Sequence, residues 1–164
     1  MKNNKGVSLI TLIITIVVII ILAAISMQTS SDIPDQANYT KYMQEMKNVQ
    51  TGVENAKLTN AKKGTSVEKL TSGFKKVYLE NAPASFVSFG DIYDEVTGYL
   101  VNLSDIGYTQ AEYGQGYRTY FENENTPTIK FGDNTSDVFV IDAEWTVYYV
   151  KGLRYKDSMN YTFK

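Results

Sequence analysis

The sequence predicts an α+β fold, in which a long N-terminal helix with a transmembrane half and an amphipathic half packs on a C-terminal antiparallel β-sheet. Two observations predict this fold. The N-terminal part combines an apolar run with a helical apolar stripe, and the C-terminal part alternates apolar and polar residues between short polar turns. Strands joined by such turns pair antiparallel. The 164 residues suit one anchored domain.

The apolar run covers residues 7–27 and contains no glycine, proline or charged residue. As a helix it is roughly 31 Å long, against a bilayer core of about 30 Å. Lys2 and Lys5 precede it, and positive charge of this kind stays on the cytoplasmic side. We therefore expect a single-pass protein of the cell membrane, with a cytoplasmic N-terminus and an extracellular head.

The residues around Gly6 give this run a more specific interpretation. The segment KGVSLITLIITIVVIIILAAI resembles the N-terminus of type IV prepilins and type II secretion pseudopilins, in which a basic leader ends in glycine before an apolar helix. The resemblance implies that a prepilin peptidase recognises Lys5, Gly6 and Val7, cuts after Gly6 and leaves Val7 as a methylated N-terminus. A secretory signal cleaved near Ser26 and an uncut anchor are the alternatives.

The resemblance also implies a fold and partners. A pilin-like fold places the long helix against the sheet of the head, as the periodicity does. The implied partners are sister subunits in a homo- or hetero-polymer, the prepilin peptidase, an assembly platform protein with its ATPase, and membrane lipid. The implied location is the membrane and then a cell-surface filament.

One residue departs from the family pattern. Pilins carry a glutamate at the fifth mature position, where this chain has Thr11. Ser8, Thr11 and Thr15 recur at i, i+3 and i+7, so they share one helix face. Small hydroxyl residues let helices in a membrane or filament pack closely and hydrogen-bond across. Alternatively, each hydroxyl bonds back to the carbonyl four residues earlier.

A second helical pattern follows. An apolar stripe at steps of three and four predicts a helix that packs on a sheet; its members are Tyr39, Tyr42, Met46, Val49, Val53 and Ala56. Charged residues, Glu45 among them, are expected mostly off this stripe. Lys62, Lys63 and Gly64 form a typical helix end. The predicted organisation is a leader (1–6), a transmembrane and polymerisation helix (7–30), an amphipathic helix (31–63) and a β-rich extracellular head (64–164).

Within the head, three hairpins are predicted. Their strands cover residues 118–121 and 128–131, 137–141 and 145–150, and 153–155 and 159–163. Upstream, Val67, Leu70, Phe74 and Val77 recur at helical spacing and predict a short helix. Residues 91–117 are glycine-punctuated and predicted to be loop, with a candidate short strand or helical turn at residues 100–103.

Composition excludes several classes of function. The chain has no cysteine and no histidine, so thiol nucleophiles, zinc–thiolate sites and histidine-based catalysis are absent. The formal net charge of −2 provides no basic surface for nucleic acid. We expect no enzyme, no catalytic residue and no cofactor.

Two groups of residues are weaker candidate sites, and each also has a simpler structural interpretation. Asp133 and Asp137 could supply oxygen ligands to calcium, although the intervening Asn-Thr-Ser sequence is also ordinary turn chemistry. Tyr108, Tyr113 and Tyr117 lie among glycines and could bind a partner, or could pack in the core.

The sequence therefore favours a structural function. We expect a major or minor pilin or pseudopilin, a subunit of a type IV pilus-like or type II secretion-like filament. The runner-up is a membrane-tethered adhesion or binding module that does not polymerise. An enzyme is a distant third, because it would need an acid pair that the sequence does not clearly provide.

Overall fold

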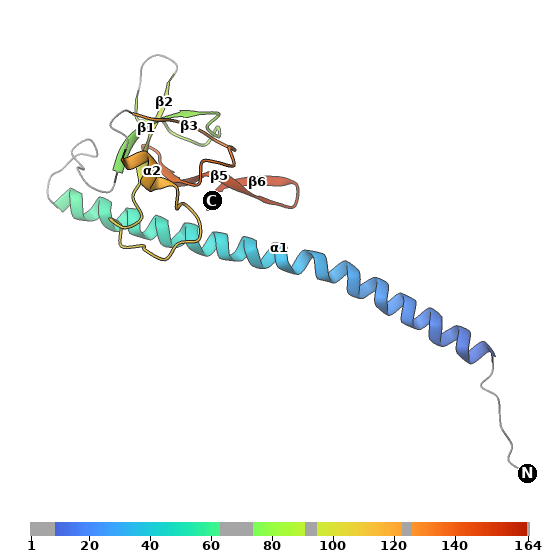
Figure 1. Ribbon diagram of the computed structural model, residues 1–164. Helices are drawn as coiled ribbons and strands as arrows, with labels where there is room; N and C mark the ends of the chain where they lie inside the picture. Colours follow the sequence, from blue (N-terminus) through green and yellow to red (C-terminus); the bar gives the residue numbers. More distant parts are fainter. Residues whose placement is uncertain (1–8, 63–73, 91–94, 123–125, 164) are drawn as a thin grey trace, which may run out of the picture. The chain divides into compact units, whose positions relative to one another are not determined.

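The structure is a computed structural model that describes residues 9–62, 74–90, 95–122 and 126–163. The chain divides into two compact units, Met1–Asn38 and Tyr39–Lys164. Helix α1 (Leu9–Lys62) contributes to both (Figure 1). In the first unit, the described backbone is the N-terminal part of this helix.

The second unit is built on a six-stranded sheet with the order β3-β1-β2-β4-β5-β6. Its elements are β1 (Phe74–Glu80), β2 (Val96–Val101), α2 (Tyr117–Phe121), β3 (Thr128–Lys130), β4 (Phe139–Ile141), β5 (Val147–Tyr155) and β6 (Ser158–Thr162). The pairs β1–β2, β2–β4, β4–β5 and β5–β6 are antiparallel, whereas β1 and β3 are parallel. The sheet is therefore mixed.

The part of α1 that belongs to this unit lies along one face of the sheet (Figure 1). Tyr42, Met46, Val49 and Val53 are completely buried, and Tyr39 and Ala56 pack at the edge of the same core. The predicted apolar stripe is thus confirmed. These side chains lie at helical spacing because only one side of the helix meets the sheet.

The opposite face of the sheet is covered by residues 81–90, which follow β1 and form the covering loop. Adjacent residues of β5 point to opposite faces, and their contacts differ accordingly. Tyr149 packs against Tyr42 of α1, with ring centroids 5.7 Å apart. Tyr148 packs against Phe86, with centroids 5.0 Å apart. The core therefore has three layers: helix, sheet and covering loop.

The predicted fold class, with its transmembrane half-helix and antiparallel C-terminal sheet, is wrong. The sheet is mixed, and it begins at β1, well before the predicted hairpins. Tyr78 pairs with Thr128 and Leu79 with Ile129 in parallel. Such pairing joins distant residues, so the local alternation that predicts hairpins does not reveal it.

The predicted membrane location is also wrong. In the parts of the chain that the structure describes, no helix is both long and apolar enough to cross a bilayer. The single-pass topology, the transmembrane keyword and the membrane-tethered alternative all depended on such a span.

Two of the three predicted hairpins are confirmed. Strands β4 and β5 pair through Phe139 and Tyr149, and β5 and β6 through Tyr155 and Ser158. The hairpin predicted from residues 118–121 and 128–131 is wrong, because the first segment is helix α2. The helix predicted around Phe74 is wrong as well, since residues 74–80 form β1.

Two glycines in the loop between β2 and α2 differ in how closely other residues pack around them. Gly114 and Gly107 both have positive φ, at 78° and 80°. A Cβ on Gly114 would overlap the Phe139 ring, whereas one on Gly107 would meet nothing within 4 Å. We predict that Gly114→Ala lowers the free energy of unfolding by about 2–4 kcal/mol, and Gly107→Ala by about 1–2 kcal/mol from backbone strain alone. Urea denaturation measures both; equal losses would contradict the packing.

Candidate functional site

The most unusual surface in the first unit is an apolar segment of α1, residues 12–21. Nine of its ten side chains are large and aliphatic, and their exposed fractions range from 48% to 64%; they are Leu12, Ile13, Ile14, Ile16, Val17, Val18, Ile19, Ile20 and Ile21. Successive helical residues are about 100° apart, so these side chains surround the helix on every side. A helix that is apolar all round is normally buried.

Thr15 is the one polar residue inside this segment. Its hydroxyl donates a hydrogen bond of 2.8 Å to the carbonyl oxygen of Leu12. This is the back-bonding alternative, made to the carbonyl three residues earlier instead of four. Thr11 lies exposed one turn before Thr15. The predicted packing role of the hydroxyl face therefore stays a prediction.

The residues predicted for leader cleavage lie outside the described part of the chain. Lys5, Gly6 and Val7, with Ser8 of the hydroxyl face, all precede Leu9, where the described helix begins. Cleavage after Gly6 and methylation of Val7 stay predictions from the sequence.

In the second unit, the two candidate calcium ligands make separate sets of hydrogen bonds. The carboxylate of Asp133 accepts from the backbone N–H and the hydroxyl of Thr135, both at 2.9 Å. These bonds lower the pKa of Asp133. The carboxylate of Asp137 accepts from the N–H groups of Gly114 (2.6 Å) and Gln115 (3.1 Å) and from the hydroxyl of Tyr149 (2.7 Å). The first arrangement is a turn and the second anchors a loop.

No group of three or more acidic residues that could hold a metal ion occurs within the described ranges. Asp142 illustrates how the acidic side chains are used instead. It is 1% exposed, and its carboxylate accepts from the N–H groups of Glu144 (3.0 Å) and Thr146 (2.8 Å). Backbone N–H groups are thus the partners of this buried acid.

Glu45 is the residue that the sequence pattern misplaced. It was expected off the apolar stripe, but it is only 7% exposed. Its carboxylate accepts from the N–H of Glu112, at 3.2 Å and 2.9 Å to its two oxygens, and from that of Tyr113 at 3.2 Å. Glu112 also forms an exposed ion pair with Lys41, one turn before Glu45 on α1. Glu45 and Lys41 of helix α1 therefore fix the loop that contains Glu112 and Tyr113.

Glu45 and Asp137 together bind five successive backbone N–H groups. Those of Glu112 and Tyr113 go to Glu45, and those of Gly114 and Gln115 go to the carboxylate of Asp137; the N–H of Gly116 donates to the Asp137 carbonyl at 2.8 Å. This segment, residues 112–116, is called the clasped loop below. It lies across α1 in Figure 1.

The loop tyrosines pack inside the fold. Tyr113 meets Tyr42 and Tyr149 edge-on, with centroids 5.5 Å and 5.6 Å away. Tyr117 is 5% exposed, and its hydroxyl lies 2.7 Å from that of Ser104. Tyr108 packs against the core and is half-buried. These positions favour packing over partner binding for Tyr113 and Tyr117.

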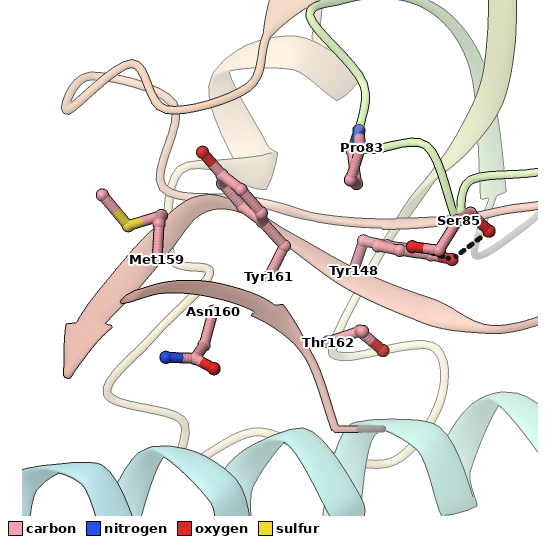
Figure 2. Close-up of a pocket in the computed structure, with 7 residues that line it drawn as sticks. All are labelled: Pro83, Ser85, Tyr148, Met159, Asn160, Tyr161 and Thr162. Carbon is pink, nitrogen blue, oxygen red and sulfur yellow. Dashed lines mark hydrogen bonds between the residues drawn. The ribbon is translucent and has the colours of Figure 1, made fainter. Parts of the chain in front are cut away.

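A small hollow lies on the other side of the sheet, between β6 and the covering loop (Figure 2). Its volume is about 210 Å³, and it is lined by Pro83, Ser85, Tyr148, Met159, Asn160, Tyr161 and Thr162. The Tyr148 hydroxyl donates a 2.8 Å hydrogen bond to the Ser85 carbonyl and closes one end. The sequence patterns did not reveal this hollow.

Comparison with known proteins identifies no relative. The chain matches no family model, and no curated protein or solved structure is significantly similar to it. Its function has to be inferred from its residues and their geometry.

The clasped loop predicts a particular pH dependence. Burial raises the pKa of Glu45, although the Tyr113 N–H and Lys41 oppose this. The folded state then binds a proton to Glu45 more tightly than the unfolded state, so this contribution to stability is lost as pH rises through the folded pKa. We predict that the stability of the wild type relative to Glu45→Gln falls as pH rises above about 4, where an unperturbed glutamate ionises. Urea denaturation of both proteins from acidic to neutral pH measures the difference, and a flat or rising difference would contradict the prediction.

Proposed function

We propose that this protein is the structural subunit of a helical filament and that copies of the chain assemble through the apolar segment of α1. The observation that carries the proposal is the ring of nine exposed aliphatic side chains at residues 12–21. Exposed apolar patches of this kind mark sites of association. The resemblance of residues 5–25 to prepilins is the second support.

The energetics favour several neighbours over one. Complete burial of an aliphatic side chain gains about 1.5–3 kcal/mol, so nine that are half-exposed gain roughly 10 kcal/mol. A single neighbouring copy covers about a third of the circumference and gains about 3 kcal/mol on each of the two segments, which is at the low end of the estimated association cost of about 4–15 kcal/mol. A bundle that surrounds the segment gains roughly 10 kcal/mol for each subunit and so offsets more of this cost.

Copies of the same chain are the simplest neighbours for such a bundle. A folded protein offers one face, whereas this segment needs cover on every side. Each additional copy brings an equal apolar segment with the same need. Repeated contacts between unlike faces generate a helical filament when the rotation between neighbours does not close into a ring. We therefore take sister subunits as the partners.

The proposed maturation step has a direct test. The resemblance to prepilins predicts that a prepilin peptidase removes residues 1–6. The mature protein should therefore begin at Val7, with a methyl group on its amine. Gly6→Val should retain Met1, because a Cβ obstructs the close approach of the peptidase to the backbone, whereas the control Asn4→Ala should be cut normally. Mass spectrometry of the intact protein reads the N-terminus; a start near Met27 would indicate ordinary secretion instead.

The proposed assembly can be tested with introduced cysteines, because the chain has none of its own. Ile14 and Ile16 lie about 200° apart around the helix, so they point to opposite sides. The double variant Ile14→Cys/Ile16→Cys should give a ladder of disulfide-linked multimers on a non-reducing gel. Ile14→Cys alone should stop at dimers.

Leu58→Cys is the matched control for this experiment. Leu58 is also on α1 and is 60% exposed, but it lies outside the apolar segment. It should stay monomeric under the same oxidation. All variants are made as full chains in cells that also express a prepilin peptidase. A ladder from Leu58→Cys, or only monomers from the double variant, would contradict the proposed contact.

A further inference from the structure

Two ends of the hollow beside β6 are fixed by contacts within the fold. The Tyr161 ring lies over Gly152, where a Cβ would come within 2.7 Å of it, and Gly152 has a φ of 71°. Phe131 meets the same ring edge-on, with centroids 5.4 Å apart. At the other end, Tyr148 is tied to Ser85. A ligand would enter a preformed site, which reduces the ordering cost of binding.

The residues that line the hollow are uncharged, and their hydroxyl groups can both donate and accept hydrogen bonds. None of its seven residues carries a formal charge. Ser85, Thr162 and Tyr161 bring hydroxyl groups, each of which can donate and accept a hydrogen bond. Hydroxyl groups on a ligand would match this lining, because they also donate and accept hydrogen bonds. An ionic ligand would find no countercharge in this lining.

Apolar surface adjoins these hydroxyl groups. Figure 2 shows Met159 and Tyr161 on one side of β6, with Asn160 on the opposite side. The amide of Asn160 is bonded back to the carbonyls of Ser158 (3.3 Å) and Leu153 (3.5 Å). Met159 is 46% exposed and forms an open rim. The ligand therefore needs an apolar face as well as a hydroxylated edge.

The volume limits the size of the ligand. About 210 Å³ is below the roughly 300–1,000 Å³ of sites for drug-sized molecules. A hollow of this volume can hold a ligand that consists of a single ring. We propose that this hollow binds one neutral sugar ring, with C–H groups against Tyr161 and Met159 and hydroxyls at Ser85 and Thr162. This binding would be independent of filament assembly.

Saturation-transfer difference NMR on the full chain tests the proposal, with D-glucose, D-galactose and N-acetyl-D-glucosamine as probes. At least one sugar should give a saturable signal with millimolar affinity. Tyr161→Ala should weaken that affinity about two- to tenfold, which is what loss of an aromatic contact costs. Because this variant also loses packing against Phe131, its folding is checked by circular dichroism.

A second variant keeps the test independent of folding. Met159→Trp fills the hollow from its exposed rim and should abolish the signal. Tyr78→Ala is the control, because Tyr78 lines a similar hollow of about 180 Å³ whose lining includes the charged residues Glu80 and Glu95; it should leave the signal unchanged. Absence of a saturable signal with all three sugars, or a signal that survives Met159→Trp, would overturn the proposal.

Discussion

The second unit depends on the contact between α1 and the sheet. A chain without cysteine cannot use disulfides, so apolar burial has to stabilise this unit. Tyr42 is at the centre of that contact: it is fully buried, its ring meets those of Tyr113 and Tyr149, and its hydroxyl donates to the Asn160 carbonyl at 3.0 Å. Burial strongly raises its pKa. One residue thus joins the helix, the clasped loop and the last two strands.

Carboxylates satisfy backbone N–H groups that this packing would otherwise leave without an acceptor. The clasped loop has no strand partner, yet it lies against the core, where an unpaired N–H costs about 1–3 kcal/mol. Glu45 and Asp137 supply the acceptors for residues 112–116. Asp142 does the same for the turn before β5. The buried Glu45 and Asp142 and the half-buried Asp137 are therefore explained by the backbone hydrogen bonds that they accept.

Local patterns in the sequence predicted the parts of the fold that depend on local contacts. The stripe from Tyr42 to Val53 and the β4–β5 and β5–β6 hairpins follow from periodicity and short turns. Strand β1 did not follow from a local pattern, because the spacing of Phe74 and Val77 also fits a helix. This segment forms a strand because it pairs with β2 and β3. Glu45 was missed for a similar reason: the N–H groups it binds are 67 and 68 residues away. The apolar segment was visible in composition alone, whereas the hollow beside β6 forms only when distant segments meet.

The apolar segment also raises the question of how neighbouring copies are aligned in the proposed filament. Aliphatic side chains pack in many registers, and a polar residue at a fixed position is the usual way to select one. Thr15 is poorly suited to that task, because the hydrogen of its hydroxyl already bonds to Leu12 and only acceptor capacity remains. The apolar segment therefore supplies affinity with little selection of register. In the proposed assembly, alignment between neighbours has to come from Ser8, from Thr11 or from contacts between the parts of the chain that follow the apolar segment.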